Sequence, residues 1–571
     1  MIPPGEQAIE TKKCRLSGQD FVITDKDLEF YDKISPTFAG KRYQIPSPTL
    51  CPDERLRRRM CFRNERNLYK RICDKTGKEF ISNYAPDAPY TVYAPEVWWA
   101  DSFSYGDYAR DFDDTKTFFD QFDELLRASP RMGLGSNPMS SENSAYTNYA
   151  GSNKNCYFVF TWGFNESCMY ITSSHSCANC YDCHKVDDCE LCFECTAVDE
   201  CYSCMHCSFL SNCRDCFWCV GLSDQTHCVY NVQYSQEEYQ KRLSEEKKLS
   251  YREVQEKVSA VRKNVVRKEN ENISCENCTG NYLKNCNEAH QCFESFDLHR
   301  AKYCEHFFMA RDAYDVFTYG KNSELVYECH YVGNNMYKIF FCHGCKMKCS
   351  DIWYTWESSG SNNLFWCAGV KKGSYCVLNK SYSKKEYEGV CARVVDHMKS
   401  TGEWWEYFPH ALSPFAYNET VAQEWFPLTQ EEVLTSPKRW PAGWSLGVGW
   451  RDEVDKRFTW NAYQPLDIKE YREDVVWTQE AKANIDYCLQ SVCVCEKSGR
   501  PYKLTKQELA FYIENDVQLP RLHSEERHKL RTQLTNHRLI QPSACDKCWK
   551  VIYTTYGPDR TEKVYCEGCS K

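Results

Sequence analysis

The sequence lacks features that mark several common protein classes. No window approaches the roughly 18 consecutive apolar residues of a membrane-spanning helix, so we expect no membrane contact. The first residues, MIPPGEQ, contain no basic region followed by an apolar run, so we expect no signal peptide. A net charge of −9 provides no overall attraction to nucleic acid. These absences together predict a cytoplasmic protein whose thiols are free or metal-bound.

A catalytic constellation is also missing. We find no recognisable arrangement of nucleophile, base and acid, and no small-molecule substrate is evident, so we lean towards a protein that is not an enzyme. The chain is instead rich in aromatic residues, at 15%, and in cysteine, with 38 of 571 residues. Cysteine at this density indicates disulfide bonds, metal sites or buried packing.

The cysteines are concentrated in one periodic stretch, residues 177–222. Every third residue there is Cys, Val or Leu, in a twelve-residue unit that occurs four times in succession. This period fits neither an α-helix, with about 3.6 residues per turn, nor a free strand, which alternates about every 2 residues. It suits a tight β-solenoid, in which each coil turns a corner every few residues and directs one side chain inward per step. The predicted inward cysteines are Cys177, Cys180, Cys183, Cys189, Cys192, Cys195, Cys201, Cys204, Cys207, Cys213, Cys216 and Cys219.

The stacked cysteines allow three interpretations. They can be packing, because Cys is small and buries well. They can form a disulfide ladder, although three cysteines per coil cannot all pair within a coil. They can bind metal, because a Cys-x-x-Cys step can chelate and a neighbouring coil can complete a tetrahedral set. Packing is favoured, because Ala, Leu, Val and Phe take the place of cysteine in a second periodic stretch from Cys286 to Tyr319.

The second periodic stretch belongs to a larger internal match. FWCVGLSDQTHCVYNVQYSQEEY, from Phe217, matches FWCAGVKKGSYCVLNKSYSKKEY, from Phe365. Both segments end in a Tyr-Ser pair that begins a helix, and Ser235 with Glu238 forms a capping-box pattern. The sequence therefore predicts two duplicated arrays that end in the same cap, with a charged helical insertion after the first.

Two further segments, residues 14–93 and 495–565, are copies of one module. CRLSGQDFVITDKDLEFY, from Cys14, matches CEKSGRPYKLTKQELAFY, from Cys495. The second copy ends in two Cys-x-x-Cys knuckles separated by seventeen residues, and the first copy keeps only Cys73 of these four cysteines. Two knuckles at this separation supply the tetrahedral thiolate set of a zinc ribbon. The predicted ligands of Zn²⁺ are Cys545, Cys548, Cys566 and Cys569, and the alternative is that these cysteines form a disulfide pair or remain free thiols.

The first module also contains a basic run, RLRRRMCFRNERNLYKRICDKTGK, from Arg55 to Lys78. Its cations could contact a phosphate backbone while Phe62 and Tyr69 stack on bases. The alternative is a helix face whose charges pair with acidic residues elsewhere. The predicted RNA contacts are Arg55, Arg57, Arg58, Arg59, Arg63, Arg66, Lys70 and Arg71.

We therefore predict a mainly β fold: a tight parallel β-solenoid of about twelve residues per coil in two duplicated arrays, with small α+β zinc-ribbon-like modules at both ends. The predicted divisions are a degenerate zinc-ribbon-like module (1–95), an aromatic and acidic helical linker (96–150), the first array (151–234), the charged insertion (235–272), the second array with its capping helix (273–400), a Trp-rich covering segment (401–485) and the C-terminal zinc-ribbon module (486–571).

Several segments also resemble a protein family. SGQDFVIT with DLEFY, CPDERLRRR, FRNERNLYKRICDKTGK, SPFAYNETVAQEWFPLT and the terminal CDKC and CEGC are similar to those of uncharacterised cysteine-rich zinc-ribbon proteins of small-genome bacteria. The resemblance covers nearly the whole chain. It implies zinc binding inside the cell and brings no known activity. Ser17 and Glu54 stand where that family often has Cys, so the resemblance implies no complete N-terminal zinc site.

Three functions are compatible with these patterns. We expect a non-enzymatic zinc-binding solenoid scaffold that presents a surface to a protein or ribonucleoprotein partner. The first alternative is an RNA- or ribosome-binding protein that uses the basic modules. The second is a metal-handling or thiol-redox protein that uses the stacked cysteines. Metal content separates them, because one or two zinc ions per chain fit the modules alone, whereas many ions fit the stacked cysteines.

Overall fold

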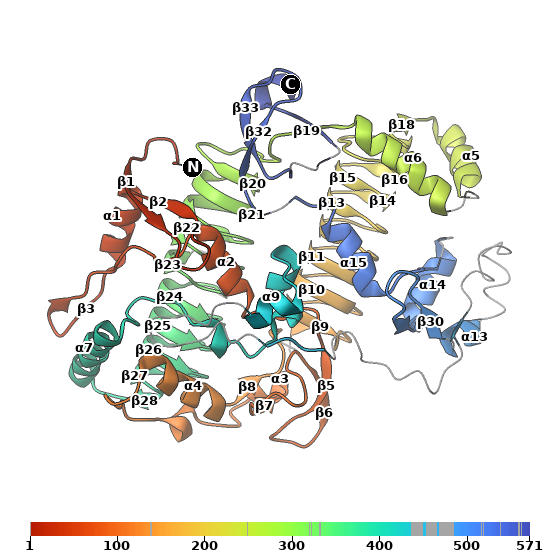
Figure 1. Ribbon diagram of the computed structural model, residues 1–571. Helices are drawn as coiled ribbons and strands as arrows, with labels where there is room; N and C mark the ends of the chain where they lie inside the picture. Colours follow the sequence, from red (N-terminus) through yellow and green to blue (C-terminus); the bar gives the residue numbers. More distant parts are fainter. Residues whose placement is uncertain are drawn as a thin grey trace. The chain divides into compact units, whose positions relative to one another are not determined.

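The computed structural model of this chain consists of two compact units (Figure 1). Unit 1 contains Met1–Gly135, Val266–Trp450 and His537–Lys571, and unit 2 contains Ser136–Val265 and Arg451–Asn536. The structure describes all residues except 1, 137–139, 248, 250, 319, 321–322, 331–332, 436–448, 453–464, 467–484, 491, 516, 518, 537, 558–559, 561 and 571. Much of the predicted Trp-rich segment 401–485 therefore lies outside the described residues.

Unit 2 contains a parallel β-solenoid with twelve residues per coil, which we call the cysteine solenoid. Residues twelve positions apart are partners, as Val186 is with Val198 and Cys204 with Cys216. This confirms the coil length predicted from the period of three. Its strands are β9 (Thr147–Gly151), β10 (Tyr157–Gly163), β11 (Met169–His175), β12 (His184–Asp187), β13 (Thr196–Asp199), β14 (Tyr202–Met205), β15 (Ser208–Ser211), β16 (Arg214–Phe217), β17 (Thr226–Val229) and the antiparallel β18 (Val232–Gln233).

A left-handed residue directly precedes each inward cysteine of this solenoid. Asn179 and Asp182, which precede Cys180 and Cys183, have φ angles of 51° and 54°. This conformation costs an L-residue about 1–2 kcal/mol. The ladder between coils offsets the cost, because Asp182 donates its backbone N–H to the carbonyl of Met169 on the preceding coil at 3.0 Å. One such corner in every three residues is the physical origin of the sequence period.

Unit 1 contains a second parallel solenoid, which we call the aromatic solenoid. Some coils have thirteen residues, as in the pairing of Ala313 with Val326, and others twelve, as in the pairing of Ile352 with Leu364. The extra residues shift the register of the inward side chains along the sequence. Its strands are β20 (Thr279–Lys284), β21 (Asn287–Lys302), β22 (Phe308–Tyr314), β23 (Ser323–Tyr327), β24 (Tyr337–His343), β25 (Ser350–Trp356), β26 (Asn362–Ala368), β27 (Ser374–Val377) and β28 (Lys380–Ser381).

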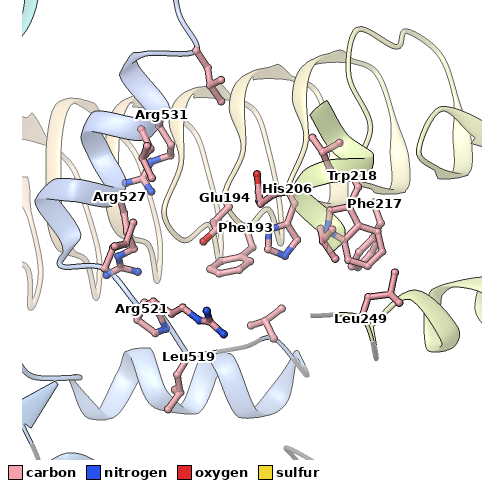
Figure 2. Close-up of a pocket in the computed structure, with 18 of the residues that line it drawn as sticks. Phe193, Glu194, His206, Phe217, Trp218, Leu249, Leu519, Arg521, Arg527 and Arg531 are labelled. Carbon is pink, nitrogen blue, oxygen red and sulfur yellow. Dashed lines mark hydrogen bonds and ion pairs between the residues drawn. The ribbon is translucent and has the colours of Figure 1, made fainter. Parts of the chain in front are cut away.

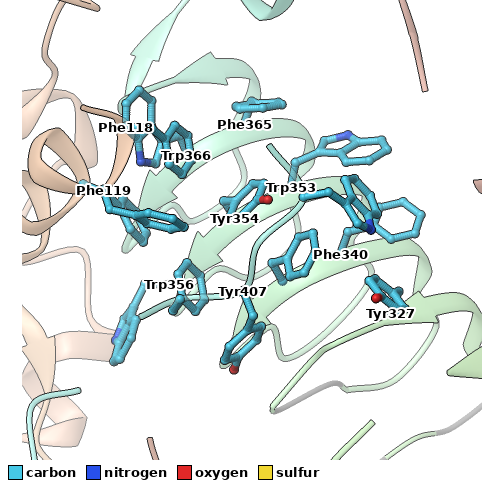
Figure 3. Packing of buried hydrophobic residues seen from close by; sticks show 14 of the residues in the cluster. Phe118, Phe119, Tyr327, Phe340, Trp353, Tyr354, Trp356, Phe365, Trp366 and Tyr407 are labelled. Atoms are coloured by element: carbon cyan, nitrogen blue, oxygen red, sulfur yellow. The ribbon is translucent and has the colours of Figure 1, made fainter. Parts of the chain in front are cut away.

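The outer face of the aromatic solenoid is covered by helices and loops of unit 1. Phe118 stacks on Trp366 with a ring-centroid distance of 3.8 Å, and Tyr407 lies edge-on near Phe62 (Figure 3). The covering helices are α1 (Asp25–Ile34), α2 (Pro52–Met60), α4 (Phe118–Ala128), α7 (Lys384–Thr401) and α8 (Val421–Trp425). Short elements of unit 1 are β1 (Ala8–Lys13), β2 (Asp20–Thr24), β3 (Thr37–Phe38), β4 (Lys41–Arg42), β5 (Tyr69–Ile72), β6 (Glu79–Ser82), β7 (Val92–Tyr93), α3 (Pro95–Trp99), η1 (Tyr105–Tyr108), β8 (Arg131–Met132), η3 (His410–Leu412), η4 (Tyr417–Glu419) and α9 (Gln430–Thr435).

The predicted charged insertion of unit 2 forms two helices, α5 (Gln236–Glu246) and α6 (Tyr251–Asn264). Ser235 caps α5 in the predicted capping box with Glu238. Thr505 caps α14 in the same way, and Phe511 of this helix stacks on Tyr181 of the cysteine solenoid at 3.6 Å. The remaining elements of unit 2 are β29 (Pro465–Leu466), α13 (Ile485–Gln490), β30 (Val492–Val494), β31 (Pro501–Tyr502), α14 (Lys506–Glu514) and α15 (Ser524–Thr532).

The C-terminal part of unit 1 is a small module that we call the C-terminal hairpin. It consists of β32 (Gln541–Ala544), β33 (Val551–Thr554), β34 (Lys563–Tyr565) and α16 (Glu567–Ser570). β34 pairs in parallel with β19 (Val266–Lys268), which leads into the aromatic solenoid. Across the described part of the chain, no helix has both the length and the apolar character that a membrane span requires.

Candidate metal centre

A tight turn at Cys545 carries two of the candidate metal ligands, and the same turn occurs at three other cysteines. In the C-terminal hairpin, Cys545 donates its N–H to the carbonyl of Lys550 and accepts from the N–H of Trp549, both at 2.9 Å. Equivalent pairs of bonds surround Cys14, Cys73 and Cys495. The turn needs a left-handed residue, which is Gly18, Gly77, Gly499 or Trp549, with φ between 62° and 71°.

Only the turn at Cys545 meets a second Cys-x-x-Cys among the described residues. The Sγ atoms of Cys545, Cys548, Cys566 and Cys569 all lie within 4.8 Å of one another, and no other group of this kind occurs in the described ranges. Zn–S bonds of about 2.3 Å in a tetrahedron place two sulfur atoms about 3.8 Å apart. Cys548 and Cys566 have their Sγ atoms 3.7 Å apart, so this set fits a four-coordinate metal ion.

The electrostatics of this cluster favour a bound cation. Burial raises the pKa of Cys545, but backbone N–H groups of Cys566, Cys548 and Lys547 outweigh it and lower that pKa to about 6. The neighbouring Cys548 and Cys566 thiols raise the pKa of Cys569 to about 12. The cluster therefore stabilises the thiolate of Cys545 and the neutral thiol of Cys569, and a divalent cation would favour the thiolate of Cys569 as well.

The other three turns have lost the second thiol of the knuckle. Ser17, Thr76 and Ser498 stand at that position, and their hydroxyl groups lower the pKa values of Cys14, Cys73 and Cys495, against burial, which raises them. In the C-terminal copy, His523 stands where Cys51 stands in the first. The fold of the turn thus persists without the four-sulfur set, because its backbone bonds do not depend on a metal.

The C-terminal hairpin is fixed to the start of the aromatic solenoid by side-chain bonds as well as by β34. Thr554 donates its hydroxyl to the carbonyl of Glu269 at 2.8 Å, and Arg267 donates Nε to the hydroxyl of Tyr556 at 3.1 Å. Asn281 of β20 donates Nδ2 to Thr555 at 2.7 Å. The candidate metal centre therefore stands beside the first coil of this solenoid.

The predicted RNA contacts are mostly inside the protein. Arg55 and Arg59 of α2 both bind Asp315 of the aromatic solenoid, at 2.9 and 3.2 Å, and Arg58 binds Glu328 at 2.5 Å. All three side chains are at most 2% exposed. These three guanidinium groups are therefore inaccessible to a phosphate backbone. They pair with acidic residues far away in the sequence instead.

The remaining predicted contacts differ in exposure. Arg63 is buried and binds Glu65 and Thr318, and Arg71 is buried and donates to backbone carbonyls. Arg57 is half-buried beside Glu54. Arg66 is half-buried, and Lys70 is exposed, 3.3 Å from Glu79.

The same docking arrangement occurs in unit 2. Asp182 of the cysteine solenoid binds Arg527 and, at 3.2 Å, Arg531, both on α15. In the module alignment these arginines match Arg55 and Arg59. Sequence reasoning did not identify the acceptors Asp182 and Asp315, although each follows a tyrosine at a coil corner, in the dipeptides Tyr181-Asp182 and Tyr314-Asp315. Those repeated dipeptides were the available signal.

The stacked cysteines pack inside the cysteine solenoid. Most of their thiols lie near two carbonyls, as Cys183 does at 3.1 Å from the oxygen of Tyr181 and 3.5 Å from that of Cys192. Burial raises the pKa of Cys183 and of Cys195. Hydrogen bonds from neighbouring thiols instead lower the pKa of Cys192, and those from Cys195 and Cys219 lower that of Cys207 against burial. Packing is therefore supported by the burial of these cysteines in one apolar cluster.

The structure also tests the disulfide interpretation of the stacked cysteines. It joins Cys342 and Cys345 of the aromatic solenoid in one disulfide. The twelve predicted inward cysteines are free. They are all buried and form one hydrophobic cluster with Val159, Ile171, Val186, Val198 and Leu210.

Comparisons with protein-family models, with curated proteins and with solved structures found no match to this chain. The family resemblance stated from the sequence therefore stays a prediction. The site must be interpreted from its own geometry.

Proposed function

We propose that this protein is a non-enzymatic solenoid scaffold whose C-terminal hairpin binds one structural Zn²⁺ and thereby fixes one end of the aromatic solenoid. The observation that carries the proposal is the four-sulfur cluster, whose spacing suits zinc, placed on a module that pairs with the strand leading into the first coil. A solenoid needs a cap at each end, because an uncovered coil exposes unpaired backbone groups to other chains.

The scaffold role is supported by the extent of covered and uncovered surface. In the cysteine solenoid, one row of exposed side chains repeats every twelve residues, at Glu190, Tyr202, Arg214 and Thr226. Repeat folds commonly use such a surface to bind a macromolecule. We propose a protein or ribonucleoprotein as the partner of this surface.

We also infer that the two solenoids and the two modules arose by duplication. The matching docking contacts support this: Phe30 stacks on Tyr314 at 3.8 Å, and Phe511 stacks on Tyr181 at 3.6 Å. In each case a pair of arginines one helical turn apart binds the aspartate that follows the stacked tyrosine.

Metal analysis of the purified full-length protein tests the zinc proposal. We expect one zinc ion per chain, and replacement by Co²⁺ should give the visible absorption of a tetrahedral cobalt thiolate. Cys548→Ser should abolish both signals and leave the C-terminal hairpin sensitive to limited proteolysis.

The matched control is Cys73→Ser, which alters the equivalent turn of the N-terminal module and should retain the zinc ion. Absence of a stoichiometric metal from protein purified without chelator would refute the zinc proposal. Several metal ions per chain would instead support ligation by the stacked cysteines.

The scaffold proposal has its own test. Affinity capture from a native lysate with the full-length protein should recover a protein or ribonucleoprotein, and ribonuclease treatment distinguishes the two. Recovery of no partner over a range of salt concentrations would count against a scaffold role.

A further inference from the structure

Unit 2 contains a cavity of about 400 Å³ on the outer face of the cysteine solenoid (Figure 2). Three elements line it: coils of the solenoid, the α6 segment and the segment around α15. Phe193, Phe217 and Trp218 contribute aromatic surface from the coils. Leu530 of α15 also lines the cavity and is 37% exposed, so this side of the cavity reaches solvent.

The aromatic solenoid shows what its corresponding face accommodates. The two solenoids can be aligned at Tyr181-Asp182 and Tyr314-Asp315. One coil further along, Phe193-Glu194 then corresponds to Tyr327-Glu328. Met205-His206 corresponds to Phe340-Phe341 and Phe217-Trp218 to Trp353-Tyr354, two and three coils beyond.

In the aromatic solenoid this position is filled by an indole ring. Trp405 lies 4.8 Å from Phe341 at 76° and 5.9 Å from Tyr327 at 12°, and it also contacts Phe340 and Trp353. Figure 3 shows the aromatic rings of these coils directed towards the covering segment that carries Tyr407. The corresponding coil residues of the cysteine solenoid line the cavity instead.

The indole ring of Trp218, which lines the cavity, belongs to a stack of rings along the solenoid axis. Trp218 is stacked between His206, at 6.0 Å, and Tyr230, at 5.3 Å, along the solenoid axis. Its faces are covered by these neighbours, and its edge remains for the cavity. Edge-to-face packing against such a ladder is favourable for a planar aromatic ring.

The cavity is lined by more cationic than anionic side chains. Five Lys or Arg residues line it against three Glu residues. Each Glu already has a nitrogen partner: Glu194 lies 2.8 Å from Nδ1 of His206, Glu246 binds Lys257 at 2.7 Å, and Glu496 lies 3.7 Å from Arg521. The lining cations are Lys247, Arg262, Arg521, Arg527 and Arg531.

The arginines gather at one end of the cavity. Figure 2 shows Arg521, Arg527 and Arg531 on one side and Trp218 with Leu249 on the other. Arg531 is buried, and this burial together with repulsion from Arg527 lowers its pKa, against the attraction of Asp182. Arg531 binds Asp182 through Nη1, whereas its Nε is buried and has no hydrogen-bond partner among the described residues. An anion at this end could accept a charge-assisted hydrogen bond from that nitrogen.

We propose that this cavity binds a planar aromatic anion, with a ring of indole or purine size over the edges of Phe193, Phe217 and Trp218 and its anionic group at Arg521 and Arg531. The ring occupies the place that Trp405 fills in the aromatic solenoid. Purine mononucleotides and indole carboxylates share this chemistry.

Calorimetric titration of the full-length, metal-loaded protein tests the proposal. The probes are adenosine monophosphate and indole-3-acetate, which combine a ring with an anion, and adenosine and inorganic phosphate, which supply one part each. We expect one bound probe per chain, with at least one combined probe binding about tenfold or more tightly than either part. Which combined probe binds better identifies the phosphate or carboxylate source.

Two variants locate the binding in the cavity. Leu530→Arg introduces the arginine that stands at the matching position of α2, where Arg58 binds Glu328. It should pair with Glu194, fill the cavity and abolish binding without lowering the melting temperature. Arg521→Gln should weaken binding about tenfold or more while the protein stays folded.

The control is Tyr202→Ala, which removes an exposed aromatic ring from the same solenoid and should leave binding unchanged. The proposal fails if no combined probe binds at about 1 mM. It also fails if a probe binds and Leu530→Arg and Arg521→Gln leave its affinity unchanged.

Discussion

At the scale of single residues, the most informative feature is one buried aspartate that binds two arginines, repeated in both units. Asp315 and Asp182 are fully buried, and so are their arginines. Burying three charges is costly, and the arrangement is stable only while the charges and hydrogen bonds are matched. These clusters therefore act mainly to specify where α2 and α15 dock.

Replacing the acceptor in unit 2 should reveal this dependence. Asp182→Asn leaves Arg531 buried without its carboxylate partner and Arg527 with Glu508 alone, and we expect a loss of about 3–5 kcal/mol in the free energy of unfolding. Asparagine tolerates the left-handed backbone of this position, so the substitution tests charge alone. Denaturant unfolding monitored by circular dichroism measures the effect.

Asp188→Asn is the matched control, because Asp188 is exposed and also left-handed, with φ of 48°. It should change the stability by less than about 0.5 kcal/mol. Equal effects of the two substitutions would show that backbone conformation, and not the ion cluster, determines the loss.

At the scale of elements, α15 begins at an unusual cap. His523 accepts the N–H of Glu525 through Nδ1 at 3.1 Å, and burial lowers its pKa to about 4, with a further contribution from Arg500. The neutral ring is thus the folded form. Because the unfolded chain has a His pKa of about 6.5, it binds more protons below that pH, and the stability falls as the pH decreases from about 6.5 towards 4.

His523→Asn should remove this acid sensitivity, because asparagine caps a helix without titrating. We expect wild type and variant to have equal free energies of unfolding at pH 7. At pH 5 the variant should be more stable by about 2 kcal/mol, because protonation of the wild-type imidazole favours the unfolded chain. Unfolding curves at both pH values measure the difference. Parallel curves for wild type and variant between pH 7 and pH 5 would contradict it.

The coil is the other element whose composition can be tested. Cys195 is fully buried, and its thiol lies 3.2 Å from the carbonyl of Cys204 on the next coil. Cys195→Ala removes one sulfur atom from a packed core, and we expect a loss of about 1–2 kcal/mol. The metal content should not change, whereas Cys548→Ser loses it. A fall in metal content with Cys195→Ala would mean that the columns ligate metal.

At the scale of the whole molecule, thiol reactivity should separate three classes of cysteine. Cys275 and Cys278 are half-exposed, and Cys548 and Cys569 of the candidate metal centre are exposed and half-exposed. The proposed zinc ion would protect Cys548 and Cys569 until it is removed. Native alkylation followed by mass spectrometry should label Cys275 and Cys278 first and Cys548 and Cys569 after chelator is added.

The inward cysteines provide the control for this experiment. They should react only after denaturation, because their thiols are buried. Rapid native labelling of Cys180 or Cys204 would contradict the closed, packed core.

The cysteine columns and the four-sulfur cluster were predictable from sequence, because both are local patterns. A solenoid coil repeats its inward position every three residues, and a Cys-x-x-Cys knuckle fixes two ligands on one turn. The caps at Ser235, Thr24 and Thr505 were predictable for the same reason, since the hydrogen-bonded groups are three residues apart.

By itself, then, the sequence determined the coil length, the inward residues and the four cysteines of the candidate metal centre. Only the tertiary structure decided which charges are exposed, because the acids that bury Arg55 and Arg58 lie 260 and 270 residues away in the chain. It also decided that one aromatic face holds Trp405 while the corresponding face lines a cavity. Such differences depend on covering segments that are distant in the sequence, so the three-residue repeat of the coils cannot predict them.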